Sequence, residues 1–336
     1  MVDLRRRQFI TLIGGTVGAW PLTARAQRPF MVPAASRPVI GYLAVAASAS
    51  VLRSATALAL ISALRDQGYS EGRDIDIIYR FADGFFDRLP ALAEELVRLR
   101  PDAILAPATI AAQAARAATT TIPIVCPLLD NPVRLGLVAS DSRPGGNVTG
   151  LLRHVEGLGG KHVELARELI PGMSRIGLLA NVASAETTPR RDVEVAAAKS
   201  GMSVVLVEVA APNDLDAAFQ KFAHERTQAV IVLHDSLFFS ERRRIMTLAA
   251  AGRLPTIWTT REFAEDGGLI TYGLDEGDSF RRAAGYLVKI LRGAKAGDLP
   301  IELPVKFELV INLKTAKALG IDVPPTILAR AAEVLE

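Results

Sequence analysis

Hydrophobic positions along this chain follow two different spacings, which alternate from residue 39 onward. Short runs rich in valine, isoleucine and leucine, such as 39–45 and 229–233, have the length and composition of buried strands. Longer stretches with apolar residues three and four positions apart, such as 158–169, have the spacing of amphipathic helices. The alternation predicts an α/β fold whose parallel sheets carry helices on both faces.

The alternation runs through the chain twice, with a break after the Gly-Gly-Asn run at 145–147. Each pass has about 110 residues, so the sequence predicts two doubly wound parallel-sheet lobes. Strands are expected at 39–45, 75–79, 103–106, 122–126, 175–180, 204–209, 229–233, 256–258 and 307–312. Helices are expected at 52–67, 88–100, 111–118, 158–169, 190–199, 215–223, 237–251 and 279–291, with a short helix from Lys314.

The first 26 residues have a different pattern, with three arginines at 5–7 before an apolar stretch at 9–22. The Ala-Arg-Ala run at 24–26 then has the small-residue pattern of a signal-peptide cleavage site. The apolar stretch is shorter than the ~20 residues that span a bilayer as a helix, which favours a cleaved signal over an anchor. The sequence therefore predicts periplasmic export by the twin-arginine or general secretion route, with residues 27–37 as a leader.

The net charge of +3 comes from the same segment, which holds four arginines and one aspartate, so the rest of the chain is neutral. A neutral body gives no electrostatic reason to bind nucleic acid or an anionic membrane. Half of the residues are hydrophobic and 22% are charged, which is typical of a globular protein with a sizeable core.

Specific catalytic and metal-binding patterns are missing from the sequence. It has no G-x-S-x-G elbow, no P-loop and no H-E-x-x-H, and its four histidines share no metal-ligand spacing. The single cysteine, Cys126, ends an apolar run with no nearby group to lower its pKa, so we expect a buried, inert thiol. The sequence predicts no catalytic residue, no metal and no cofactor.

Polar side chains gather where the predicted strands end, and parallel sheets bind ligands at the carboxyl ends of their strands. The hydroxyls are expected to hold a carboxylate, the acidic side chains an amine or hydroxyl, and the tryptophan an apolar group. Each residue also fits a purely structural role, such as capping a helix or shaping a turn. The candidate ligand-binding residues from these strand ends are Ser48, Ala108, Thr109, Asp130, Asn131, Asn181, Asp235, Trp258 and Glu262.

Distinctive motifs are spread over residues 37–336. They are RPVIGYL at 37–43, GYSEGR at 68–73, DRLPALAEELV at 87–97, TIPIV at 121–125, LGLVA at 135–139, RPGGNVTG at 143–150, REFAEDGGL at 261–269, YG at 272–273 and KFELVINLKTAKALG at 306–320. Together they resemble the ABC-transporter substrate-binding protein family with the type I periplasmic-binding fold, in the branch that includes tryptophan- and tyrosine-type binders. Tyr272, from one of these motifs, joins the candidate ligand-binding residues.

The resemblance implies two lobes joined by a three-crossing hinge, which traps a ligand between them by closing. The expected function is capture of a small organic solute, an amino acid (aromatic ones included) or a related carboxylate, for a membrane permease with a cytoplasmic ATPase. Delivery of this kind needs only a monomer. The crossings are expected near 147–152, 269–275 and 302–307, with one lobe at 38–148 and 275–304 and the other at 149–274 and 305–336.

The sequence departs from the family at 181–184, where Asn-Val-Ala-Ser stands in place of the usual Asn-Pro-x-Asn-Pro. This departure leaves the exact ligand open. A periplasmic ligand sensor for a membrane receptor would use the same fold and cleft, and stays as an alternative. An exported enzyme is the weaker alternative, because the sequence offers no nucleophile–base pair.

Overall fold

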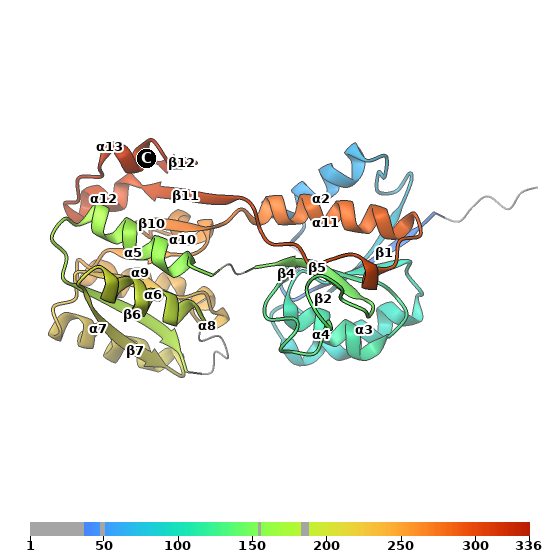
Figure 1. Ribbon diagram of the computed structural model, residues 1–336, viewed down its shortest axis with the longest axis horizontal. Coiled ribbons are helices and arrows are strands. Elements are labelled where there is room, and N and C mark those ends of the chain that lie inside the picture. The colour runs from blue at the N-terminus through green and yellow to red at the C-terminus, as the bar shows by residue number, and fades with distance from the viewer. Residues whose placement is uncertain (1–36, 48–50, 154–155, 183–187) are drawn as a thin grey trace, which may run out of the picture. The chain divides into compact units, whose positions relative to one another are not determined.

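The computed structural model describes residues 37–47, 51–153, 156–182 and 188–336, which form an α/β protein with two sheets (Figure 1). Contacts divide the chain into residues 1–36 and 37–336, and all described residues belong to the second unit. The expected export signal and Ser48 therefore lie outside the described residues. Within the described part, no helix has both the length and the apolar character needed to cross a bilayer.

The first sheet has five parallel strands, and its central strands are buried almost throughout, as expected of a sheet covered on both faces. Cys126 is fully buried in this sheet, as predicted, and burial raises the pKa of its thiol to about 12. In spatial order the strands are β2 (Asp76–Phe81), β1 (Val39–Ala44), β3 (Ala103–Leu105), β4 (Ile124–Leu129) and β5 (Val148–Leu152).

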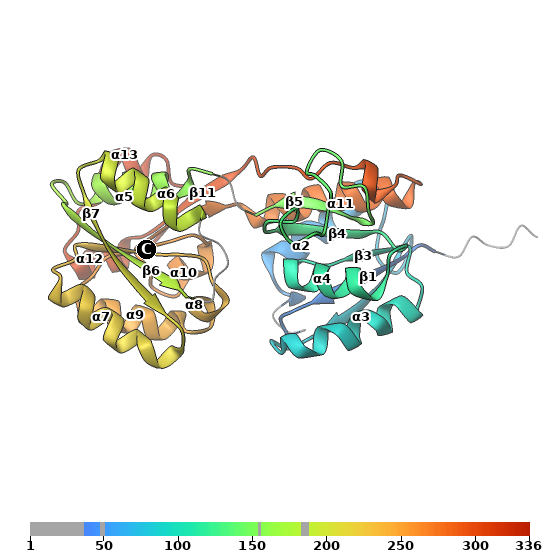
Figure 2. The same ribbon diagram turned by 60° about the horizontal axis from the view of Figure 1, so that its bottom comes forward.

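Two pairs of helices cover the two faces of the first sheet, each pair packed in its own hydrophobic cluster (Figures 1 and 2). One pair is α2 (Ala55–Asp66) and α11 (Glu276–Leu291), and the other is α3 (Leu89–Arg98) and α4 (Thr109–Ala118). Ser54 caps α2, because its Oγ accepts the Ala57 N–H at 3.1 Å, so this helix begins three residues later than the spacing predicts.

The second sheet has seven strands, and one neighbouring pair, β10 with β11, is antiparallel. The sequence predicted parallel sheets; β11 runs the other way because it enters from the first lobe. In spatial order the strands are β12 (Glu333–Leu335), β11 (Phe307–Asn312), β10 (Ile270–Leu274), β9 (Thr256–Trp258), β8 (Ala229–Val232), β6 (Arg175–Asn181) and β7 (Ser203–Val209).

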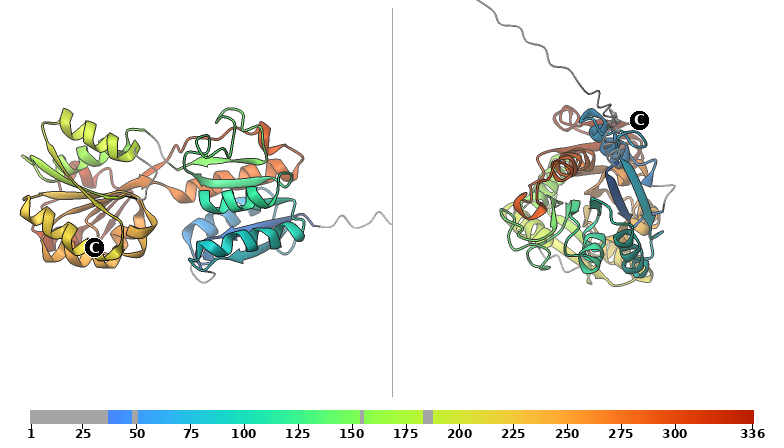
Figure 3. Two further views of the ribbon diagram at one scale, coloured as in Figure 1. Left: turned by 90° about the horizontal axis from the view of Figure 1, so that it is seen from below. Right: turned by 90° about the vertical axis from the view of Figure 1, so that its right-hand side faces the viewer.

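Helices also cover both faces of the second sheet (Figure 3, left). On one face lie α5 (Leu158–Leu169), α6 (Thr188–Lys199), α12 (Leu313–Leu319) and α13 (Pro325–Leu328). On the other lie α7 (Leu215–His224), α8 (Ser236–Ser240), α9 (Arg242–Ala251) and α10 (Arg261–Glu265). Residues 237–251 were predicted as one helix, but the structure divides them at Glu241, which ends α8 and precedes α9. Short 3-10 turns lie at Phe86–Arg88, Pro212–Asp214 and Ala296–Asp298.

The chain passes between the two sheets three times, after β5, after β10 and before β11. The Leu152 N–H donates to the Glu302 carbonyl at 2.8 Å, and the Asp275 N–H donates to the Lys306 carbonyl at 3.0 Å. The segment that leads into β11 is therefore hydrogen-bonded to both other passages. Strand β5 belongs to the first sheet as far as Leu152, whereas the sequence predicts that this part of the lobe ends at residue 148.

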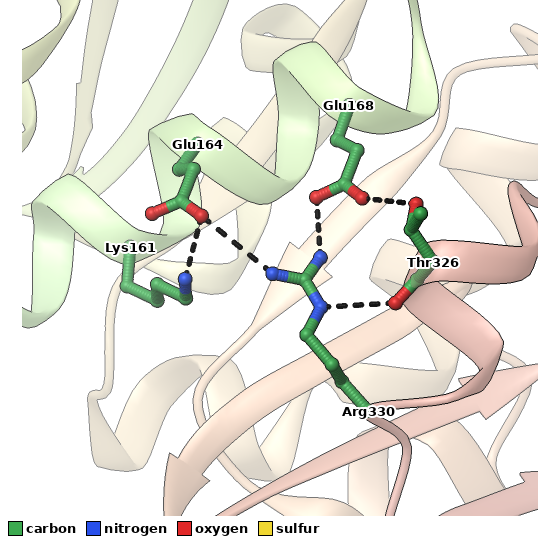
Figure 4. A network of polar contacts seen from close by, with 5 residues as sticks. All are labelled: Lys161, Glu164, Glu168, Thr326 and Arg330. Carbon is green, nitrogen blue, oxygen red and sulfur yellow. Dashed lines mark hydrogen bonds and ion pairs between the residues drawn. The ribbon is translucent and has the colours of Figure 1, made fainter.

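A polar network ties the short helix α13 to α5 near the end of the chain (Figure 4). The Arg330 guanidinium contacts Glu168 and lies 3.6 Å from Glu164, which Lys161 also contacts at 2.6 Å. The Thr326 hydroxyl donates to Glu168 at 2.6 Å, and this hydrogen bond, with Arg330, lowers the pKa of the Glu168 carboxyl. Exposed pairs of this kind contribute at most about 1 kcal/mol each, so they orient α13 more than they stabilise it.

Candidate functional site

A cavity of about 200 Å³ lies where strands of the second sheet end and where α5 and α11 begin. Its lining combines carboxylates, arginines, histidines and threonines with a few apolar side chains such as Leu158 and Leu233. Parallel sheets leave such a crevice at the carboxyl ends of their strands, because loops there turn into helices. This position and mixture of side chains make the cavity the candidate ligand-binding site.

Arg153 occupies a central place among the lining residues. It directly follows β5, and its side chain is 20% exposed. Its guanidinium contacts the His234 imidazole, while its Nε lies 3.9 Å from Asp130 Oδ2 and its Nη2 lies 3.7 Å from Glu276 Oε1. Asp130 follows the neighbouring strand β4, His234 follows β8, and Glu276 is the first residue of α11. Arg153 thus joins residues that the two sheets and one crossing supply.

Burial, and to a smaller extent the neighbouring charges, sets the protonation states around Arg153. Burial and the charge of Arg153 together lower the pKa of His234 to about 3, so the imidazole is neutral and accepts from the guanidinium at Nε2. Burial raises the pKa of Glu276; the carboxylates of Glu262 and Asp130 act in the same direction, and Arg153 opposes them. The group therefore holds one fixed cation beside an excess of carboxyl groups.

Asp235 and Asn181 form a second polar group in the cavity. Asp235 Oδ1 accepts from Asn181 Nδ2 at 2.9 Å and from the backbone N–H of Leu237 at 2.8 Å. The second bond makes Asp235 the N-cap of α8. Asp235 therefore holds the Asn181 amide in place and begins a helix at the same time.

Two hydroxyls supply further polar contacts to the cavity. Thr259 and Thr260 line it, and their Oγ1 atoms are buried without a hydrogen-bond partner among the described residues. A buried polar atom without a partner costs free energy, which a ligand that bonds to it would recover. No group of three or more histidine, cysteine or acidic side chains in the described ranges is arranged to hold a metal ion.

The structure brings three of the predicted site residues together in the cavity: Asp130, Asn181 and Asp235. Thr109 lies outside it, because its Oγ1 accepts the Asp130 N–H at 2.8 Å and donates to the Leu128 carbonyl at 3.3 Å. It supports the turn that carries Asp130. The remaining candidates within the described residues also lie outside the lining: Ala108, Asn131, Trp258, Glu262 and Tyr272.

Trp258, which was predicted to hold an apolar group of the ligand, does not line the cavity. Trp258 is 1% exposed, and its ring stacks on Phe263 with 4.1 Å between centroids. Successive residues of a strand point to opposite faces, so Trp258 points into the core while Thr259 faces the cavity. Tyr272 stacks on Phe307, and its carbonyl accepts from His162 Nε2 at 2.6 Å.

Asn131, Ala108 and Glu262 have structural surroundings of their own. Asn131 is exposed with a φ of 45°, in the turn after β4. Ala108 is the N-cap residue of α4. Glu262 is exposed on α10, close enough to Glu276 to raise the pKa of that carboxyl.

Sequence reasoning missed Arg153 and Glu276. Both lie at passages between the sheets, where the hydrophobic spacing predicts neither strand nor helix. One signal was available for each: Arg153 ends the apolar run after the motif at 143–150, and Glu276 follows an aspartate that caps a helix.

Comparisons with known proteins agree with the predicted fold. The family model described as "ABC transporter substrate binding protein" matches residues 50–335. A "Tyrosine-binding protein" of Clostridioides difficile (strain R20291) is 29% identical over 260 residues, 77% of this chain and 74% of that protein.

Two solved structures are similar over most of the chain. One, an ABC domain in complex with L-Trp from Streptococcus pneumonia, has a TM-score of 0.79 at 26% identity, and the match covers 89% of this chain and 100% of that chain. The other, a conserved domain protein from Vibrio cholerae O1 biovar El Tor str. N16961, has a TM-score of 0.78 at 29% identity and covers 88% and 99%. These neighbours have the type I periplasmic-binding fold, which confirms the predicted fold class.

Proposed function

Because the chain belongs to the ABC transporter substrate-binding protein family, we propose that it captures a small solute in the cavity around Arg153 for import. The solute passes to a membrane permease whose cytoplasmic ATPase drives transport. Capture takes place in the periplasm, after export directed by the basic and apolar segments of the first 26 residues. Proteins of this family bind their substrates and are not enzymes.

The proposed solute is an α-amino acid with an aromatic side chain. The observation that carries this proposal is the presence of an arginine, several carboxyl groups and unpartnered hydroxyls in one cavity of about 200 Å³. A zwitterion needs partners of both signs, and the lining of this cavity supplies both. The names of two similar proteins, a tyrosine-binding protein and an ABC domain in complex with L-Trp, support the same class of ligand.

Closure of the hinge is the proposed means of holding the solute. The lining residues come from both lobes: Asp130 follows the first sheet, whereas Asn181 and Asp235 follow strands of the second. A solute that contacts both groups has more favourable interactions when the lobes are close together, so its binding shifts the hinge toward the closed state.

The direct test is a thermal-unfolding titration of the purified chain with amino acids, aromatic acids and other small carboxylates. A solute that binds only the folded chain stabilises it by about 2.7 kcal/mol at one hundred times its Kd. We expect L-tyrosine or L-tryptophan to raise the melting temperature saturably and non-aromatic amino acids to raise it less. A panel in which no amino acid raises the melting temperature would contradict the proposed ligand class.

Asp235 is proposed as an acidic contact for the amine of the solute, through Oδ2, since Oδ1 already accepts two hydrogen bonds. Asp235→Ala is expected to weaken amino-acid binding about tenfold to a hundredfold, as loss of a charged hydrogen bond does. Asp235→Asn is the matched control for the helix cap, because asparagine caps helices as well as aspartate does. If Asp235→Asn binds as tightly as the unmodified chain, Asp235 acts through its cap and not through its charge.

A further inference from the structure

Two consecutive threonines in the cavity lining have hydroxyls that no other part of the described chain engages. Thr259 and Thr260 directly follow β9, and both line the cavity. Their Oγ1 atoms are buried, and neither forms a hydrogen bond with a described residue. Thr260 is the N-cap residue of α10, a position where a threonine side chain commonly accepts a backbone N–H, yet it makes no such bond. Both hydroxyls are therefore available to a ligand.

Leaving these hydroxyls unbonded costs the folded protein free energy. Buried polar groups are nearly always hydrogen-bonded in proteins, because they have lost their contact with water and need another partner. Thr259 and Thr260 are two exceptions side by side, in the lining of one cavity. Their positions point to a partner that enters the cavity.

Other side-chain donors in the lining already have partners. Arg190 Nη1 donates to Glu208 Oε1 at 2.8 Å, and Asn181 Nδ2 donates to Asp235 Oδ1 at 2.9 Å. Arg153 is also engaged, through the contacts described above. A solute carboxylate that bonded to one of these groups would disturb an existing contact, whereas the two threonine hydroxyls can donate to it without losing any bond.

We propose that Thr259 and Thr260 bind the carboxylate of the solute, each through its hydroxyl hydrogen, and that the site thereby favours amino acids over the corresponding amines. This inference rests on the proposed function, because it names the residues that recognise one end of the amino acid. A hydroxyl that donates to an ionised carboxylate forms a short hydrogen bond, about twice as strong as one between neutral groups. Two such bonds fix both the position and the orientation of the carboxylate.

The strand order places this carboxylate site beside the proposed amine contact. Strands β9 and β8 are parallel neighbours, with Ile257 paired to Ile231, so Thr259 and Asp235 follow strand ends at the same edge of the sheet. Neighbouring strands lie about 4.8 Å apart. The carboxylate and the ammonium group of an α-amino acid are attached to one carbon atom, so they are suited to partners on adjacent strand ends. The second lobe thus supplies contacts for both charged ends of the solute.

The experiment combines Thr259→Val and Thr260→Val with two ligands, L-tyrosine and tyramine, which differ only in the carboxylate. Calorimetry measures both affinities for the full chain, and L-tryptophan with tryptamine forms a parallel set. The unmodified chain is expected to bind L-tyrosine at least about tenfold more tightly than tyramine. Each variant is expected to bind L-tyrosine about tenfold to a hundredfold more weakly and to keep its tyramine affinity within about threefold, because only the bond to a charged group is lost.

Should tyramine bind too weakly to measure, L-tyrosinamide replaces it, since its amide is neutral where L-tyrosine has a carboxylate. The loss of affinity in each variant is then expected to be smaller for the amide than for L-tyrosine, because a neutral acceptor forms the weaker hydrogen bond. An equal loss would contradict the proposal.

Melting temperatures without ligand separate a binding role from a structural one. Valine has the shape of threonine without the hydroxyl, so each substitution removes a buried polar atom that has no partner among the described residues. Both variants are therefore expected to melt at the temperature of the unmodified chain or about 1–3 °C above it. A hydroxyl that held the local structure together would instead lower the melting temperature when it was removed.

The matched control is Thr271→Val. Thr271 lies in β10, which pairs with β9, and it is 1% exposed. Its Oγ1 also has no hydrogen-bond partner in the described ranges, but the residue lies outside the cavity lining. The same substitution there is expected to change the melting temperature in the same direction and to leave both affinities within about twofold.

The outcomes separate this inference from the proposed function. Unchanged L-tyrosine binding in both variants would overturn the inference, and equal loss of L-tyrosine and tyramine would assign the hydroxyls to another part of the solute. A fall in melting temperature that Thr271→Val does not show would give them a structural role. In each case the unmodified chain still binds L-tyrosine, so the proposed function stands. Failure of the unmodified chain to bind either amino acid would instead overturn the proposed function, and the inference with it.

Discussion

Gly273→Ala is expected to lower the free energy of unfolding strongly, because the added methyl group has no room in the second sheet. Gly273 lies in β10, beside the segment that follows β9. A Cβ atom at this position would overlap the Thr259 carbonyl oxygen and lie 2.7 Å from its carbon. Neither of these backbone atoms can rotate away as a side chain could, so the strands must separate. We expect a loss of more than about 3 kcal/mol, beyond the 1–3 kcal/mol typical of an overpacked core.

The measurement is the free energy of unfolding in urea, and the control is the same substitution in a helix. Gly285 lies inside α11, and a Cβ atom there meets no other atom within 4 Å. Gly285→Ala is expected to stabilise the protein by about 0.5–1 kcal/mol, because alanine favours the helix and restricts the unfolded chain. A Gly273→Ala protein as stable as the unmodified chain would show that the two segments do not approach this closely.

The second large effect is expected at Trp258, on stability and not on binding. The indole is 1% exposed and packs on Phe263 inside the hydrophobic cluster beneath α9 and α10. Trp258→Ala removes a large buried side chain and is expected to cost about 3–5 kcal/mol. If the indole stood in the cavity, as the sequence analysis expected, the same change would lower the affinity for solute at a smaller cost in stability.

Trp258→Phe separates these two possibilities more sharply. Phenylalanine keeps the stacking on Phe263 and removes the indole N–H, which finds no hydrogen-bond partner in the described residues. We therefore expect Trp258→Phe to cost less than about 1.5 kcal/mol and to change the affinity for amino acids by less than twofold. Urea unfolding and calorimetry measure the two quantities. A large loss of affinity in this variant would return Trp258 to the ligand site.

Much of the fold could be predicted from the sequence because hydrophobic spacing is a local property. The helix at 158–169 and the strands at 256–258 and 307–312 have the predicted bounds. The elements that sequence reasoning left out are short or lie at the passages between the sheets, as β5 and β10 do. β5 is a strand because it pairs with β4, and β10 is a strand because it pairs with β9 and β11. A pairing partner that is distant in the chain leaves no periodic signal in the sequence.

Some residues of the candidate site could likewise be predicted from local sequence, whereas others could not. Asp130, Asn181 and Asp235 could be predicted because each stands where a strand ends, and strand ends of a parallel sheet face the ligand. Arg153 and Glu276 meet only because the chain leaves the first sheet after β5 and returns to it at α11. The residues that flank Arg153 and Glu276 in the sequence do not indicate that the two side chains lie close together.

The sequence by itself determined the two-lobed α/β architecture and the family, because both depend on local spacing and on motifs that can be read in order. Tertiary structure decided which polar groups share a cavity and why particular glycines stand in the motifs. At Gly150, as at Gly273, a Cβ atom would overlap a backbone carbonyl, that of Cys126, and only the pairing of β5 with β4 reveals this. The physical reason is that spacing along a chain fixes which face a residue shares with its neighbours, whereas the distance between segments depends on how the strands pair and the chain crosses.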